Sequence, residues 1–192
     1  MSLLDKLPIR RFVTVPGPGD SEAYLGLLKS IQAKNIPFEI AANGSIEQLA
    51  PDLKLIYWQP LDQDAASLND QSLVLQLIHR DLRILLSGDL EAEGEAALLQ
   101  TPGFEPRHEI IKAPHHGSKT SSTPAFVQAV NPRHALVSVG ERNRYRHPSP
   151  EVLDRYTQQG IRTWRTDSHG ALCLCSRGSE YEIRTAATSE PQ

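Results

Sequence analysis

The strongest constraint on the fold of this chain is an alternation of short apolar runs with helical stretches that continues from residue 72 to residue 185. Runs of strand length are separated either by a few turn residues or by stretches with helical apolar spacing. The expected strands lie at 7–16, 38–40, 53–58, 73–79, 83–87, 109–113, 134–139, 161–165, 170–175 and 180–184, and the expected helices at 21–34, 91–100, 123–130 and 149–159. Such an order predicts an α/β protein with mixed sheets.

The composition is that of a folded domain. The chain has 192 residues, of which 39% are hydrophobic and 22% charged, and this excludes disordered, collagen-like and coiled-coil proteins. No apolar run approaches the ~20 residues that span a bilayer, so we expect a soluble chain as given. We expect a single domain over 1–185 and a disordered tail over 186–192.

Charge is distributed unevenly along the chain. Residues 1–106 carry 8 basic and 15 acidic side chains, whereas residues 107–165 carry 10 basic and 4 acidic ones, an excess of +6. Residues 166–192 carry 2 basic and 4 acidic side chains. The basic segment is either an ordinary solvated surface or a surface that faces a phosphate-rich substrate.

Three of the expected strands end in polar residues that could carry chemistry. Asp89 follows the strand at 83–87, the pair His115 and His116 follows the strand at 109–113, and the stretch 143–147 follows the strand at 134–139. Groups just past the carboxyl ends of strands tend to converge in α/β proteins. The polar turn at 69–72 is either a brace for this site or a plain turn.

Each of these residues has more than one interpretation. Asp89 could cap the helix that follows it or serve as a carboxylate ligand of a divalent metal ion. His115 and His116 would point in opposite directions on an extended backbone, so only one is expected to bind a given metal ion. His147 could be a general acid or a phosphate contact.

Five segments, read in order, resemble one family. They are 69–75 (NDQSLVL), 84–95 (ILLSGDLEAEGE), 111–122 (IKAPHHGSKTSS), 137–140 (VSVG) and 143–153 (NRYRHPSPEVL). They are similar to the C-terminal metallo-β-lactamase-fold domain of ComEC-type DNA internalisation proteins, the membrane channels of natural competence. The resemblance implies a four-layer αββα sandwich, a site for two divalent ions, zinc or manganese, and a phosphodiesterase or nuclease role in DNA uptake.

The resemblance also assigns roles to particular residues. Asp89 matches the metal-bridging aspartate and His116 is the favoured histidine ligand. His115 and His147 are the expected proton-donating, catalytic residues. Substrate binding is expected of Asn143, Tyr145 and Ser118. Arg146 stands where the family's loop has glycine, which puts the position of that loop in question.

One family motif has no counterpart. Metallo-β-lactamase folds collect most metal ligands from a His-x-His-x-Asp-His loop, and that sequence does not occur in this chain. We therefore expect a domain that is incomplete at its N-terminus, with an open sheet edge that favours dimerisation. The expected partners are single-stranded or transported duplex DNA and the channel portion of a parent protein in the bacterial inner membrane, with the domain at the membrane surface or in the periplasm. The alternative is a catalytically incomplete module that binds DNA or a partner.

Overall fold

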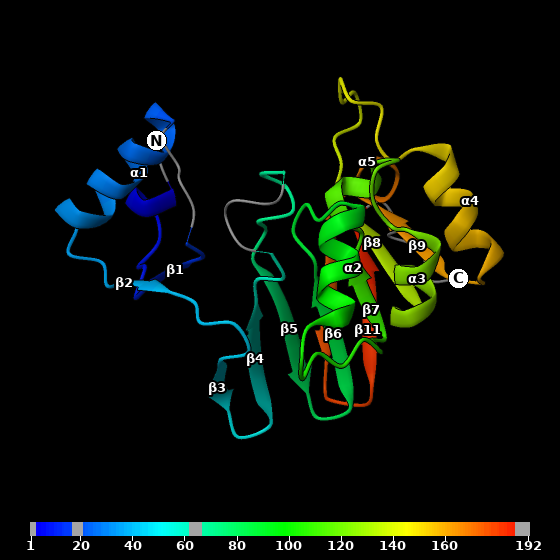
Figure 1. Ribbon diagram of the computed structural model, residues 1–192, viewed down its shortest axis with the longest axis horizontal. Helices are drawn as coiled ribbons and strands as arrows, with labels where there is room; N and C mark the ends of the chain where they lie inside the picture. Colours follow the sequence, from blue (N-terminus) through cyan, green and yellow to red (C-terminus); the bar gives the residue numbers. More distant parts are fainter. Residues whose placement is uncertain (1–2, 17–20, 62–66, 187–192) are drawn as a thin grey trace.

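The computed structural model describes residues 3–16, 21–61 and 67–186, and its main body is a seven-stranded sheet (Figure 1). The tail predicted to be disordered lies outside the described residues, except for Ala186. The strand order is β3-β4-β5-β6-β7-β8-β9. These strands are β3 (Ile46–Ala50), β4 (Leu53–Trp58), β5 (Val74–His79), β6 (Leu82–Leu86), β7 (Ile110–Lys112), β8 (His134–Val137) and β9 (Arg162–Arg165).

The sheet is antiparallel on one side of β6 and parallel on the other. Strands β3 to β6 pair as antiparallel neighbours, while β6, β7, β8 and β9 pair in parallel. Parallel neighbours need crossover connections, and these are provided by α2 (Ala92–Gln100), α3 (Pro124–Val130) and α4 (Pro150–Gln158). The carboxyl ends of the four parallel strands therefore lie along one edge.

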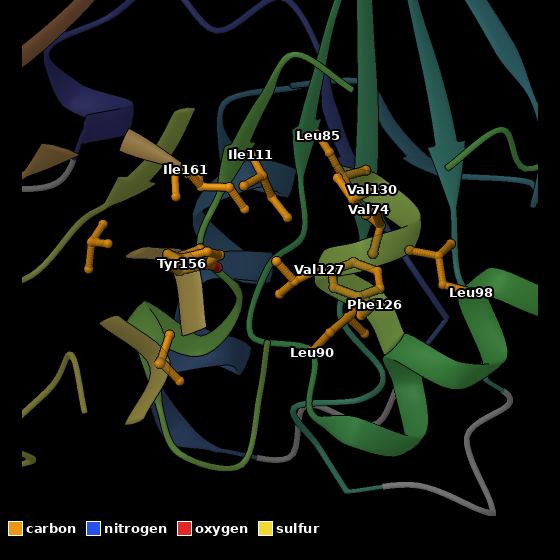
Figure 2. Packing of buried hydrophobic residues seen from close by; sticks show 14 of the residues in the cluster. Val74, Leu85, Leu90, Leu98, Ile111, Phe126, Val127, Val130, Tyr156 and Ile161 are labelled. Carbon is orange, nitrogen blue, oxygen red and sulfur yellow. The ribbon is translucent and has the colours of Figure 1, made fainter. Parts of the chain in front are cut away.

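Strands β5 to β8 are covered on both faces of the sheet. The three crossover helices pack on one face, where Leu90, Phe126, Val127 and Tyr156 are buried against the strands (Figure 2). On the other face a hairpin of β10 (Leu172–Ser176) and β11 (Tyr181–Thr185) packs through Leu174 and its neighbours.

The predicted α/β class is confirmed, and so is the order of helices, sheet and second sheet. The outward side chains of the hairpin are exposed: they are Cys173, Cys175, Glu182 and Arg184. Within the part of the chain that the structure describes, the outer helical layer of a four-layer αββα sandwich is thus not seen.

A smaller unit precedes the main sheet. It consists of the 3₁₀ turn η1 (Leu3–Asp5), β1 (Phe12–Thr14), α1 (Glu22–Ala33) and β2 (Phe38–Ile40), and β1 pairs in parallel with β2. In Figure 1 it stands beside β3 and β4. The predicted strand–helix–strand order is confirmed, but the first strand is only three residues long.

Sequence patterning missed β3, an edge strand of the main sheet. Its apolar side chains face solvent, with Ile46 62% and Leu49 47% exposed, so no buried face marks it in the sequence. No helix among the described residues is long and apolar enough to cross a membrane.

The turn at 69–72 braces the start of α2, as one of its two interpretations predicted. Asp70 is 3% exposed, and its Oδ1 accepts hydrogen bonds from the backbone N–H groups of Glu91 (2.7 Å) and Gly94 (3.0 Å). Ser72 Oγ accepts a hydrogen bond from the Asp89 N–H at 2.9 Å. The turn therefore fixes both the helix start and the loop that carries Asp89.

This close approach predicts an unusual effect of alanine at Gly94. A Cβ atom there would lie 2.5 Å from Asp70 Oδ1 and 2.7 Å from Leu90 Cδ2. Gly94→Ala should lower the free energy of unfolding by about 1–3 kcal/mol, although alanine is the better helix former. The control is Gly26→Ala in α1, where no atom lies within 4 Å of the added Cβ. Urea unfolding should show no loss for Gly26→Ala, and equal effects of both substitutions would contradict the packing argument.

A buried carboxyl group joins α2 to α3. Glu95 is fully buried and accepts hydrogen bonds from the backbone N–H groups of Ser122 and Thr123, the latter at 2.8 Å. Burial raises the pKa of Glu95 from 4.5 to about 7, and those two donors oppose the rise. The folded protein consequently holds a proton on Glu95 that the unfolded chain has released above pH 4.5.

Glu95 should therefore make stability fall as pH rises from 4.5 to about 7. Its contribution is fully present below the lower value and is lost through the upper one, about 3 kcal/mol in all. Glu95→Gln cannot ionise, so it does not share this loss. The unfolding free energy of Glu95→Gln minus that of the original protein should therefore rise between pH 4.5 and about 7. Denaturant unfolding at several pH values measures it, and a difference independent of pH would disprove the shifted pKa.

Candidate functional site

Polar residues gather where the parallel strands end. The loop after β6 carries Asp89, the turn after β7 carries His115 and His116, and the loop after β8 carries His147. Backbone contacts tie these segments together, since the His115 N–H donates to Gly88 O at 3.3 Å and the Ser149 N–H donates to Gly117 O at 2.8 Å. The convergence predicted from the strand ends is present.

The histidine pair lies on a left-handed turn. The 3₁₀ turn η2 (Pro114–Gly117) has φ values of 44° at His115, 55° at His116 and 79° at Gly117. The extended backbone assumed for the pair is therefore wrong. Non-glycine residues held at positive φ cost of order 1–3 kcal/mol each and persist only where surrounding contacts enforce them. Here a Cβ on Gly117 would lie 2.7 Å from Pro148 Cβ. Glycine is therefore required for the turn at 114–117 to contact the loop at 140–148.

Asp89 lies between a histidine and a lysine. Its Oδ1 is 3.5 Å from His116 Nε2 and 3.5 Å from Lys112 Nζ. Lys112 also donates to Gly88 O at 2.6 Å, and burial lowers its pKa while Asp89 opposes that shift. The N-cap residue of α2 is Glu91, so the interpretation of Asp89 as a helix cap does not hold.

The two histidines face different partners. His116 Nδ1 lies 2.6 Å from the carbonyl oxygen of Ser138, which leaves Nε2 directed at Asp89. His115 Nδ1 instead lies 3.2 Å from Glu91 Oε1, and the Thr120 hydroxyl donates to the same oxygen at 2.7 Å. Hydrogen bonds from Thr120 and from Ser67, together with the His115 ring, keep the pKa of Glu91 below its usual value.

The loop at 140–148 forms a wall of the site. Asn143 holds it closed: its Oδ1 accepts from the His147 N–H at 2.9 Å, and its Nδ2 donates to His147 O at 2.8 Å. Arg146 has φ of 57°, the left-handed conformation that the family's glycine would adopt easily. Arg146 thus holds a left-handed conformation in this loop without being glycine.

His147 and Tyr145 line a cavity of about 480 Å³ with His116, Ser138, Asn143 and Thr166. The His147 ring centroid is 5.5 Å from that of His115 and 5.8 Å from that of Tyr145. Burial lowers the pKa of His147, as do the neighbouring His115 and His116, while Asp89 acts in the opposite direction. The lowered pKa favours the neutral imidazole, in which one ring nitrogen donates a hydrogen bond and the other accepts one.

Not every predicted residue lines this cavity. His116, His147, Asn143 and Tyr145 line it. Asp89 and His115 do not: Asp89 contacts His116 at 3.5 Å, and the His115 ring lies against that of His147. Ser118 is 5% exposed, and its hydroxyl bonds to Thr120 Oγ1 at 2.9 Å, beside the Glu91 network. The role of Ser118 in substrate binding stays a prediction without a position in the cavity.

Sequence reasoning missed three residues that shape the site. Lys112 neutralises Asp89, Glu91 orients His115, and Thr166 joins β9 to the loop after β8 by accepting from the Val139 N–H at 2.7 Å. The position of Thr166 directly after a parallel strand could have indicated its place. Glu91 gave no such signal, because an acidic residue at the N-terminus of a helix is ordinary.

Asp89 and His116 have the spacing of two ligands of one zinc ion. Two ligands on one tetrahedral ion, each about 2.1 Å from it, lie roughly 3.4 Å apart, and the 3.5 Å between Asp89 Oδ1 and His116 Nε2 matches that spacing. A zinc site takes three or four protein ligands. Among residues 3–16, 21–61 and 67–186, no group of three or more His, Cys, Asp or Glu side chains is placed to hold a metal ion. This donor set does not fit a complete metal centre.

Comparison with known proteins relates the chain to competence proteins. It is 32% identical to ComE operon protein 3 of Bacillus subtilis over 171 residues, which is 88% of this chain and 22% of that protein. It is 35% identical to the competence protein ComA of Neisseria gonorrhoeae over 60% of this chain and 17% of that protein. Recombination protein 2 of Haemophilus influenzae is 32% identical over 62% of this chain and 15% of that protein.

The chain is thus a relative of the ComEC-type competence proteins and spans about a fifth of the length of the curated relatives it matches. The family predicted from the motifs is confirmed. No family model matches the sequence. A crystal structure of a candidate metal-dependent hydrolase from Parabacteroides distasonis has a TM-score of 0.46 and 12% identity, covering 72% of this chain and 61% of that one. Similarity at that level adds nothing to the fold described above.

The two-donor arrangement predicts weak metal binding by this chain alone. After gel filtration, the 192-residue chain should retain less than one zinc ion per molecule by elemental analysis. Calorimetric titration should detect weak binding that Asp89→Asn and His116→Ala abolish. The control, Asp154→Asn, changes an exposed aspartate on α4 and should alter nothing. A stoichiometric ion lost only in the first two variants would show that the chain builds a full centre.

Proposed function

We propose that this chain is part of a hydrolase-type domain that acts on the phosphodiester bonds of DNA during uptake in natural transformation. The observation that carries the proposal is the convergence of Asp89, His116, His115 and His147 at the carboxyl ends of parallel strands. The similarity to competence proteins over 88% of the chain supports the link to DNA uptake.

The electrostatics of the segment agree with a polyanionic substrate. The +6 segment at 107–165 contains the three histidines and also Lys112 and Arg144. Phosphate groups are attracted to such surfaces, and the attraction weakens as salt rises. In our proposal the loop at 140–148 binds the strand, and Asn143 keeps that loop in position rather than contacting the substrate.

His147 and His115 are the proposed proton carriers. The His147 ring lines the cavity and could deliver a proton to a leaving oxygen, and His115, 5.5 Å away between ring centroids, is held by Glu91. Imidazoles suit proton transfer because their usual pKa lies near neutrality, and the lowered pKa of His147 makes its protonated form the stronger acid.

Asp89 and His116 are the proposed contributors to a divalent-metal centre of zinc or manganese. A metal ion in such a centre would activate water and neutralise charge that develops on the phosphate. Because two donors do not make a stable zinc site, the proposal requires further ligands from residues other than those that the structure describes. We derive no catalytic step from the ion.

The incomplete donor set favours a second candidate, a module that binds DNA or a partner without cleaving it. Lys112, with Nζ 3.5 Å from Asp89 Oδ1, already supplies a positive charge where an ion would otherwise be needed. In either case we propose that the parent protein lies in the bacterial inner membrane, with its channel portion as partner and this domain at the membrane surface or in the periplasm. The edge strand β3, with exposed Ile46, is the proposed surface for a dimer.

The transformation frequency of the source organism separates the hydrolase from the binding module. A hydrolase needs both ligands, so Asp89→Asn and His116→Ala in the complete gene product should each reduce transformation by about 100-fold or more, the scale on which loss of one transition-state contact acts. Asp154→Asn, the same chemical change at an exposed position on α4, should leave transformation unchanged.

Normal transformation in Asp89→Asn and His116→Ala, with the proteins present at normal levels, would overturn the hydrolase proposal. That result would support the binding module, since binding does not depend on these two ligands.

A further inference from the structure

The loop at 140–148 ends in an exposed aromatic side chain surrounded by cations. Tyr145 is 63% exposed, although large aromatic side chains are usually buried. Three arginines, Arg142, Arg144 and Arg146, are exposed on the same loop, against one acidic residue, Glu141. More than half of the Tyr145 side chain is therefore accessible from solvent, in a strongly cationic setting.

The Tyr145 ring contacts two other flat groups, the Arg144 guanidinium and the His147 imidazole. The Arg144 guanidinium lies over the ring at 4.7 Å from its centroid and donates a hydrogen bond to its hydroxyl. The His147 ring is nearly parallel to the Tyr145 ring, with an interplanar angle of 13° and 5.8 Å between the ring centroids. His147 in turn meets His115 edge to face at 5.5 Å.

We infer that Tyr145 is a stacking platform for an unpaired base of single-stranded DNA, with the neighbouring arginines holding the flanking phosphates. The inference rests on the proposed function, because it specifies the form of DNA that the same loop receives. Aromatic rings interleaved with arginines are the usual means of binding single strands, since every base has a flat face.

Arg144 and a base would compete for the face of the Tyr145 ring, and the strengths of the two contacts decide which one occupies it. An exposed cation–π contact is worth roughly 2- to 5-fold in an equilibrium constant, whereas stacking of one base on an aromatic ring is worth roughly 5- to 150-fold. A base therefore displaces the guanidinium from the ring. Arg144 remains nearby and can then pair with a phosphate, so the contact in the free protein keeps the ring covered until the strand arrives.

The platform selects single strands for a geometric reason. In a duplex both faces of each internal base are covered by its neighbours, so only unpaired or terminal bases can stack on a protein ring. A base held at Tyr145 would place its backbone over the cavity that His116, His147 and Thr166 line. The platform would thus set which phosphate enters the site.

The test compares three fluorescent probes by anisotropy: a short oligothymidylate, an abasic oligomer with the same number of phosphates, and a blunt duplex. The original chain should bind the oligothymidylate about 10-fold more tightly than the abasic oligomer. Tyr145→Ala should remove that preference and leave abasic binding unchanged, and Tyr145→Phe should restore it. Circular dichroism should be unaltered, because the side chain is exposed.

Arg142→Ala is the matched control for charge. It removes a phosphate contact but no ring, so it should weaken binding of all three probes by a similar factor and reduce the salt dependence by about one charge. Equal binding of the oligothymidylate and the abasic oligomer, unchanged in Tyr145→Ala, would overturn the platform while leaving DNA binding intact. If the original chain binds none of the probes, the DNA-binding part of the proposed function fails together with the platform.

Discussion

The parallel pairing of β6, β7, β8 and β9 is the constraint on which the rest of the molecule depends. Parallel neighbours need a crossover between each pair of strands, here three helices that lie on one face, and these four strands end at the same edge. That edge is where the chain leaves the hydrogen-bonded sheet and where polar side chains can gather beside an apolar core. Asp89, His116 and His147 lie close together for this reason, although they are far apart in sequence.

Local strain at that edge is supported from several sides. The left-handed backbone of His115 and His116 persists because Gly117 packs on Pro148 and because His116 Nδ1 lies 2.6 Å from the Ser138 carbonyl oxygen. The loop that carries Asp89 is held by the turn at 69–72, where Ser72 Oγ accepts a hydrogen bond from the Asp89 N–H. Strained residues enforced in this way are typical of functional sites, where the cost of the conformation fixes the direction of a side chain.

The site has a defined geometry but offers few side chains that could bind a metal ion. Asp89 and His116 are spaced as two ligands of one ion would be, yet the adjacent cation is Lys112 and the other histidine faces Glu91. The contacts among His147, Tyr145 and Arg144 are, by comparison, complete within this chain. In our proposal this part of the site receives and orients a DNA strand, whatever chemistry follows.

The sequence by itself determined the fold class, most element positions, the family and the residues that meet at the site, because apolar periodicity and strand-end motifs are local signals. It did not determine the edge strand β3, whose apolar residues are exposed, or the left-handed turn at the histidine pair. Only the tertiary structure decided that Lys112 lies against Asp89 and that Glu91 holds His115. Those contacts join residues on different elements, and their distances depend on packing that no local pattern records.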